Sequence, residues 1–256
     1  MINEYHRPEK LEQALKLLAR DEPLTIPIGG GSALNRSSLE SFAVVDLQAL
    51  GLNTFQMQGK SLLIGATVTL QSLLEQVERN LLPNLAGLAK AIKHEGTHNL
   101  RQVGTVAGTL VAADGRSPFT AAMLALDAHL TLEPGESQIG LGDLLPLRHE
   151  RLRGRLITQA VIPTHTVLVY EYVARSPADL PIVCAAVAVW PSGRVRAVLG
   201  GHGRLPMLVF DGTEPQGLEE AARSAYSQAE DEWASASYRE DVAGILVRRA
   251  LAEARG

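Results

Sequence analysis

The sequence Gly104-Thr-Val-Ala-Gly-Thr-Leu110 and the earlier turn Gly29-Gly-Gly-Ser-Ala33 decide the fold. Each turn follows an apolar or mixed polar and apolar run, and each has small residues where larger side chains would keep a ligand away. Successive small residues expose backbone N–H groups, which bind anions such as phosphate. One such turn can be a simple bend at the end of a strand, but two in one chain predict a phosphate-bearing ligand held from two sides.

The composition describes an ordinary globular chain of 256 residues, of which 46% are apolar and 20% charged. This length is enough for one large domain or for two to three small ones. The net charge of -4, without a basic tail or arm, argues against binding to nucleic acid. No apolar run is long enough to span a bilayer, and the first residues lack a signal-peptide pattern, so we expect a soluble, cytoplasmic protein.

The chain contains a single cysteine, Cys184, inside the apolar run Ile182–Trp190. One cysteine excludes an internal disulfide and an iron–sulfur cluster held by this chain alone. A catalytic thiol usually has a polar, electropositive setting, so we expect Cys184 to be buried and structural.

Apolar periodicity predicts an α+β chain. The order of predicted elements changes near Pro163–Thr166, because strands follow one another there without intervening helices. We place a domain boundary at this point. The predicted helices are 8–20, 70–79, 83–93, 119–126, 219–230 and 237–254, with a single helical turn at 143–145, and the predicted strands are 24–28, 43–47, 62–65, 129–132, 156–163, 167–173, 182–190 and 194–199.

The stretch His94-Glu-Gly-Thr-His98 matches the HExxH motif of zinc proteases. That chemistry needs both histidines on one face of a regular helix, together with a third ligand. Here Gly96 lies between the histidines at the predicted end of a helix, and Gly104 stands where a third histidine would be. We therefore expect surface histidines and no metal ligand. A zinc hydrolase ranks third, behind the two hypotheses given below.

A second apparent motif, Gly200-Gly-His-Gly203, follows a strand as a dinucleotide-binding fingerprint does. Pro206 occupies the place of its third glycine and would interrupt the entering helix. We interpret this stretch as a bend at the end of a strand.

Three motifs of the first half come in an order that identifies a family resemblance. These are Pro27-Ile-Gly-Gly-Gly-Ser32, Ile64-Gly-Ala-Thr-Val-Thr-Leu70 and Leu100-Arg-Gln-Val-Gly-Thr-Val-Ala-Gly-Thr109. They resemble the motifs of the FAD-binding medium subunit of the molybdenum hydroxylases, the family of carbon monoxide dehydrogenase and xanthine dehydrogenase. The second half is similar to the C-terminal domain of that subunit at 170–175, 178–183, 234–239 and 246–251.

The resemblance implies a fold and a role. The fold is α+β: a two-subdomain FAD-binding domain of the PCMH type over residues 1–164, with subdomains of about 1–60 and 61–164, and then a C-terminal domain over 165–256 with a three-stranded antiparallel sheet and a helical bundle. The role is that of an oxidoreductase subunit, a flavoprotein. A molybdopterin subunit would oxidise the substrate, an iron–sulfur subunit would relay the electrons, and the FAD of this subunit would pass them to an acceptor.

The resemblance also implies which residues bind FAD. One side of the pyrophosphate would lie against the first turn and the other side against the second, with no catalytic side chain and no metal ligand, because the chemistry belongs to the flavin. The implied cofactor-binding residues are Ile28, Gly29, Gly30, Gly31, Ser32, Ala33, Thr69, Thr105, Ala107, Gly108 and Thr109.

Five positions depart from the family pattern: Gln102 and Tyr172, which replace an Asn and a Lys, and three positions at the expected flavin site. Ala107 stands where the family has a second glycine, Thr109 where it has Asn or Asp, and Pro118 where it has an aspartate that holds the sugar-like chain of the flavin. A methyl group at Ala107 is costly if that residue needs a positive φ or if phosphate must touch the backbone. These departures keep a second hypothesis open, that of a scaffold or assembly subunit of the same fold with lost or weakened FAD binding.

Overall fold

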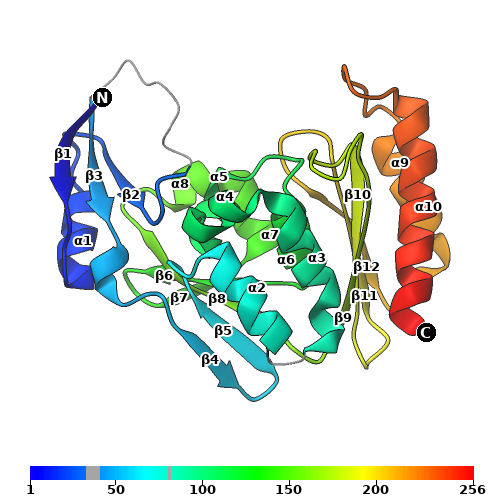
Figure 1. Ribbon diagram of the computed structural model, residues 1–256, viewed down its shortest axis with the longest axis horizontal. Helices are drawn as coiled ribbons and strands as arrows, with labels where there is room; N and C mark the ends of the chain where they lie inside the picture. Colours follow the sequence, from blue (N-terminus) through cyan, green and yellow to red (C-terminus); the bar gives the residue numbers. More distant parts are fainter. Residues whose placement is uncertain (33–40, 80–81) are drawn as a thin grey trace. The chain divides into compact units, whose positions relative to one another are not determined.

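A computed structural model describes residues 1–32, 41–79 and 82–256 (Figure 1). Their contacts form two compact units, each built from segments that are distant in the sequence. The first unit combines Met1–Leu73, Asn99–Ala112 and His129–Val161, and the second combines Leu74–His98, Ala113–Ala128 and Ile162–Gly256.

The first unit begins with a small parallel sheet in the order β1-β3-β2. Its central strand is buried at all five positions, as expected for a parallel strand covered on both faces. Helix α1 packs on this sheet through Ala14 and Leu18, which contact Val45 and Leu47. The elements are β1 (Ile2–His6), α1 (Leu11–Leu18), β2 (Thr25–Ile28) and β3 (Phe42–Asp46).

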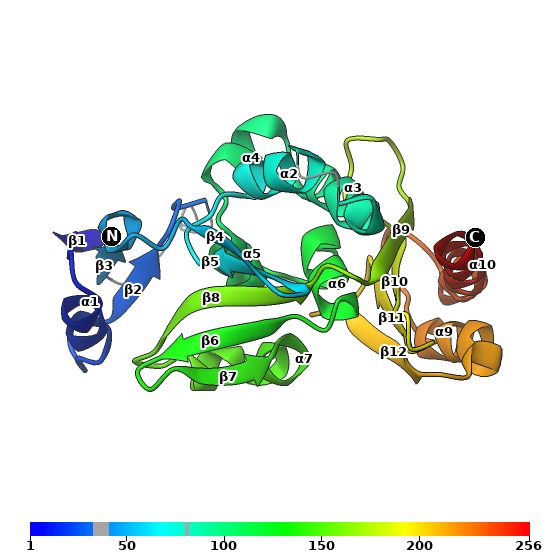
Figure 2. The same ribbon diagram turned by 90° about the horizontal axis from the view of Figure 1, so that it is seen from below.

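A five-stranded sheet in the order β4-β5-β8-β6-β7 forms the rest of the first unit. Figure 2 shows β8, β6 and β7 side by side. The strands are β4 (Phe55–Gln58), β5 (Ser61–Gly65), β6 (His129–Glu133), β7 (Ser137–Gly140) and β8 (Leu156–Pro163), and the accompanying helices are α4 (His98–Val103), α5 (Val106–Ala112), α7 (Leu141–Leu144) and α8 (Arg148–Arg151). Helix α2 (Leu70–Arg79) begins in the first unit, and its residues from Leu74 onward belong to the second.

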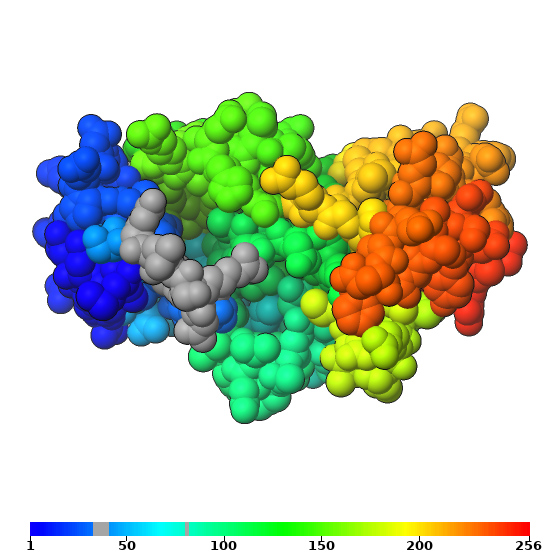
Figure 3. Space-filling model, turned by 90° about the horizontal axis from the view of Figure 1, so that it is seen from above, coloured from blue at the N-terminus to red at the C-terminus, as the bar shows by residue number. Residues whose placement is uncertain are grey.

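The second unit contains an antiparallel sheet in the order β12-β11-β10-β9. Helices α3 and α6 cover one face of this sheet and α9 and α10 cover the other (Figure 1). Helices α9 and α10 pack against one another, and their orange and red atoms form one continuous surface in Figure 3. The elements are α3 (Ala86–Glu95), α6 (Pro118–Ala125), β9 (Val167–Val173), β10 (Val183–Val189), β11 (Val195–Gly200), β12 (Met207–Gly212), α9 (Leu218–Tyr226) and α10 (Ala236–Arg255).

The implied three-stranded sheet is wrong by one strand, because the edge strand β12 was not predicted. Its burial does not alternate, and Met207 and Leu208 are both exposed, so the period-two pattern that identifies a half-buried strand is absent. The α+β fold class is confirmed.

None of the helices in 1–32, 41–79 and 82–256 is both long and apolar enough to cross a membrane.

Strand β10 is buried on both faces of its sheet. Val183, Ala185 and Val187 pack into the cluster that includes α9 and α10. Cys184, which alternates with them, is fully buried, as predicted. Burial raises the pKa of its thiol to about 12, so Cys184 stays protonated and unreactive at neutral pH.

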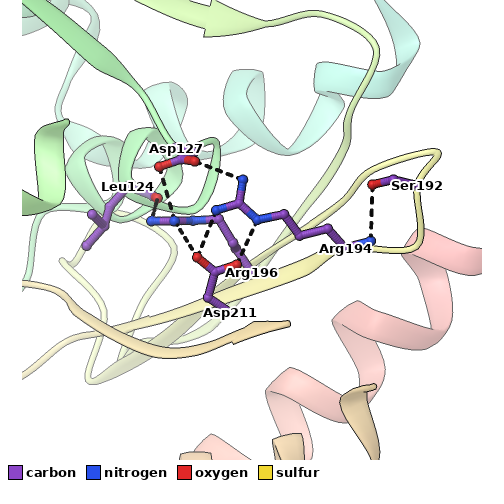
Figure 4. A network of polar contacts seen from close by, with 6 residues as sticks. All are labelled: Leu124, Asp127, Ser192, Arg194, Arg196 and Asp211. Atoms are coloured by element: carbon purple, nitrogen blue, oxygen red, sulfur yellow. Dashed lines mark hydrogen bonds and ion pairs between the residues drawn. The ribbon is translucent and has the colours of Figure 1, made fainter. Parts of the chain in front are cut away.

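A network of two arginines and two aspartates joins α6 to strands β11 and β12 (Figure 4). Arg194 bonds Asp211 through Nε at 2.7 Å and Asp127 through Nη1 at 2.9 Å. Arg196 bonds Asp211 through Nη1 at 2.7 Å and donates to the carbonyl of Leu124 at 3.2 Å. The hydrogen bonds from Arg194 lower the pKa of Asp211. The opposite charges balance, which allows Arg196 to be buried.

Candidate functional site

The two glycine turns approach each other within the first unit. A Cβ atom added at Gly29 would lie 2.6 Å from Thr105 Oγ1, and one added at Gly30 would lie 1.5 Å from the carbonyl oxygen of Val103. Neither gap accommodates a methyl group. Gly29 and Gly30 are therefore required by the contact between the turns themselves.

A pocket of about 260 Å³ lies beside these turns. Ligand pockets typically measure about 300–1,000 Å³, so this one suits part of a dinucleotide such as FAD. The expected residues that line it are Ile28, Gly29, Gly30, Gly31, Ser32, Thr105, Ala107 and Gly108. The other lining residues are Ile26, Pro27, Leu47, Ala66, Thr67, Val111, Ala112, Leu152, Arg155, Leu156 and Ile157.

The first turn has the features of an anion cradle. Gly31 has a φ of 73°, in the left-handed region, and a Cβ there would meet no atom of the described residues within 4 Å. Among the described residues, the N–H groups of Gly29, Gly30, Gly31 and Ser32 have no hydrogen-bond acceptor. Donors in sequence beside open space are what a phosphate group binds.

The second turn differs, because its N–H groups are already bonded within the protein. Ala107 donates to the carbonyl of Ala66 at 3.2 Å. Gly108 donates to Thr105 Oγ1 at 3.2 Å, and Thr109 donates to the carbonyl of Thr105 at 2.8 Å. The hydroxyl proton of Thr105 has no acceptor among the described residues, so this side chain can still donate a hydrogen bond into the pocket.

The methyl group of Ala107 is compatible with its backbone. Ala107 lies in helix α5, and the non-glycine residues with positive φ in the described chain are Asp127 and Glu136. A glycine is therefore not needed at this position for conformational reasons. Ala107 forms part of the pocket wall.

Two of the expected binding residues, Thr69 and Thr109, are not found in the pocket wall, and a third lies outside the described residues. The hydroxyl of Thr69 accepts from the N–H of Ser72 at 3.1 Å and so caps the start of α2. A threonine directly before an amphipathic helix is a capping signal that the sequence already contains. Thr109 does not line the pocket, and Ala33 lies outside the described residues.

Two polar lining residues were missed by the sequence interpretation. Thr67 lies two residues before Thr69, and Arg155 comes from the distant segment before β8.

Pro118 is the first residue of α6, a position that proline suits, and Ser117 caps this helix.

Residues of the HExxH match form hydrogen bonds within the second unit. Helix α3 ends at Glu95, directly after His94, whose Nδ1 lies 2.9 Å from Tyr170 Oη and whose Nε2 lies 2.7 Å from the carbonyl of Asp179. Burial raises the pKa of Glu95 to about 7, although the carboxylate accepts from the N–H of Phe119 at 2.8 Å. No group of three His, Cys, Asp or Glu side chains that could hold a metal occurs in the part of the chain that the structure describes.

Comparison with known proteins identifies the family. Residues 1–165 match the model of the FAD binding domain in molybdopterin dehydrogenase. The chain is 30% identical to protein YgfM of Escherichia coli K12, covering 96% of this chain and 94% of YgfM. It is 26% identical to the carbon monoxide dehydrogenase medium chain of Hydrogenophaga pseudoflava, covering 97% and 95% of the two chains.

The fold is shared with solved structures. A carbon monoxide dehydrogenase from Hydrogenophaga pseudoflava superposes with a TM-score of 0.81 at 22% identity, over 98% of this chain and 96% of that chain. This likeness supports the fold class. Together with the family match, it confirms the predicted resemblance, and the chain belongs to the FAD-binding domain family of the molybdopterin dehydrogenases, as an oxidoreductase component whose family cofactor is FAD.

Proposed function

We propose that this chain binds FAD and transfers electrons inside a complex with an iron–sulfur subunit and a molybdopterin subunit. The observation that carries the proposal is the pocket beside the paired glycine turns, where the N–H groups of Gly29–Ser32 have no acceptor among the described residues. The medium-chain relatives support a place in such a complex. In this proposal residues 1–164 bind the flavin and 165–256 form the C-terminal domain.

The pocket residues fit this cofactor. The N–H groups of Gly29–Ser32 would hold the pyrophosphate, and the hydroxyl of Thr105 would donate a further hydrogen bond. Ala107 and Gly108 would form the facing wall. Bound FAD would supply the redox chemistry, since it accepts and releases electrons at potentials that the protein tunes.

The apolar lining has a separate role. Leu47, Leu156 and Ile157 are almost fully buried and belong to the wall of the pocket. They would exclude water from the bound group and strengthen the hydrogen bonds from the first turn, because electrostatic interactions are stronger in a low dielectric. No side chain of this chain needs to act as a general acid or base.

The iron–sulfur clusters would belong to another chain. Cys184 is the one cysteine of the sequence and is fully buried in β10. Clusters are held by several thiolates, so electrons would reach the flavin from a partner subunit.

Co-expression with the two partner subunits tests the proposal. The purified complex is expected to be yellow, with a flavin absorbance band and with iron and molybdenum in the other chains. A colourless complex that does not respond to added FAD would overturn it.

One observation favours the second hypothesis, that of a scaffold subunit without FAD. In the second turn, the N–H groups of Ala107, Gly108 and Thr109 are already bonded within the protein, and Ala107 lines the pocket. Calorimetry with FAD separates the hypotheses. Binding tighter than micromolar rejects the scaffold, and no binding supports it.

A further inference from the structure

Arg155 is the one charged side chain among the described residues that line the pocket. It lies between α8 and β8, and its N–H donates to the carbonyl of Leu152 at 3.1 Å. Its guanidinium donates to Ser137 Oγ on β7. The side chain is half-buried, so these contacts hold it at the wall of the pocket.

The charge of Arg155 is not neutralised by any of the described residues. In the described ranges, no carboxylate forms an ion pair with its guanidinium, whereas Arg194 and Arg196 both have aspartate partners. One hydrogen bond to Ser137 leaves several of the five guanidinium donors available. An unpaired cation beside apolar walls attracts an anion more strongly than one in bulk water does.

The internal hydrogen bonds of the second turn increase the share of phosphate binding that depends on the charge of Arg155. Because the N–H groups of Ala107, Gly108 and Thr109 are bonded internally, that turn adds few donors for a phosphate. Among the described lining residues, the positive charge of the pocket comes from Arg155.

We propose that Arg155 is a specificity-determining residue that makes the pocket prefer ligands with a diphosphate group over the same ligands without phosphate. This inference rests on the proposed function, since it assigns to Arg155 the selection of FAD by its charge. Ser137 would position the guanidinium. Because the charge rather than the fork geometry carries the preference, lysine is expected to replace arginine with little loss.

The test measures the affinities of the wild-type chain, R155Q and R155K for FAD, ADP and riboflavin by calorimetry at two salt concentrations. R155Q is expected to weaken FAD and ADP about tenfold each, and R155K to weaken them less than about threefold. The affinity for riboflavin, which carries no phosphate, should be the same in all variants. The salt dependence of FAD binding should be smaller in R155Q than in wild type.

R153Q is the matched control, because Arg153 is exposed, lies two residues away and does not line the pocket. It removes the same charge and should bind FAD as wild type does. An equal loss in R153Q would assign the effect to net charge and overturn the inference. An equal loss for riboflavin and FAD in R155Q would assign it to packing, with the same consequence.

The remaining outcomes separate the two proposals. If wild type binds FAD and R155Q binds it equally well, only the inference about Arg155 fails. If wild type binds neither FAD nor ADP, the proposed function fails and the inference fails with it. If R155Q does not fold, R155K decides: an affinity near that of wild type, falling with salt, supports the inference, and a tenfold loss overturns it.

Discussion

The two glycine turns of this chain have similar compositions but different backbone surroundings. Gly29–Ser32 follows strand β2 and has free N–H groups in the described part of the chain. Gly104–Thr109 leads into helix α5, and the N–H groups of Ala107, Gly108 and Thr109 are bonded to Ala66 and Thr105. Small residues therefore indicate where a backbone can closely approach a ligand or another segment, but they do not indicate whether the backbone N–H groups are free to bind a ligand.

The glycines of the first turn also serve two purposes. Gly29 and Gly30 are required because Thr105 and Val103 lie against them, whereas Gly31 has a positive φ and no described neighbour within 4 Å of an added Cβ. Packing between the turns and room for a ligand are thus separate properties of adjacent residues.

The largest expected effect comes from Gly30→Ala, which tests the contact between the turns. The added Cβ would lie 1.5 Å from the backbone oxygen of Val103, and backbone atoms cannot move aside cheaply. We expect the free energy of unfolding to fall by about 3 kcal/mol, the upper part of the range for overpacking. Urea unfolding measures it.

Gly31→Ala is the control for this prediction. It adds the same methyl group where no described atom lies within 4 Å, so the expected cost is the strain of a positive φ, about 1–2 kcal/mol. Equal losses in the two variants would show that the turns do not touch as described.

A smaller effect is expected from Thr105→Val, which removes the hydroxyl of the second turn that faces the pocket. The affinity for FAD should fall about tenfold, or about 1.4 kcal/mol, because one hydrogen bond to the ligand is lost. Thr105→Ser should retain most of the affinity, and Thr109→Val, outside the pocket wall, should retain all of it. A loss confined to Thr109→Val would reverse the assignment of the two threonines.

Much of the fold could be predicted from the sequence where apolar periodicity is strong. Helix α2 and strands β8 and β9 have the predicted bounds. The missed strands β1, β4, β7 and β12 are edge strands with mostly exposed or half-buried residues. Such strands are defined by their hydrogen-bonded neighbour, which a local pattern does not contain.

The candidate site could be predicted only in part. Local composition pointed to both turns, and the family resemblance implied that they act together. Arg155 carried no signal because it reaches the pocket from a segment some fifty residues away, where the single glycine of the turn, Gly154, is not part of a run of small residues. The internal bonding of Ala107 and Gly108 depends on the position of Ala66 and on the rotamer of Thr105, which spacing alone does not fix.

Thr69→Ala separates the structural threonines from those of the pocket. Loss of the cap on α2 should lower the free energy of unfolding by about 1 kcal/mol. The affinity for FAD should not change, since Thr69 does not line the pocket. Thr67→Ala, at a lining position, is the matched variant. A tenfold loss of FAD affinity in Thr69→Ala would show that its hydroxyl leaves Ser72 to bind the ligand.

The smallest expected effect, Ala107→Gly, tests whether the second turn resists FAD because of its methyl group or because of its hydrogen bonds. The N–H of residue 107 donates to Ala66 in either case, so removing the methyl group frees no donor. We expect the FAD affinity to change less than about threefold, or about 0.6 kcal/mol. The free energy of unfolding should fall by about 0.5–1 kcal/mol, because glycine weakens a helix. A tenfold gain in affinity, measured by calorimetry, would instead mean that the methyl group alone keeps the phosphate from the backbone. The two turns would then differ by one side chain rather than by their hydrogen bonding.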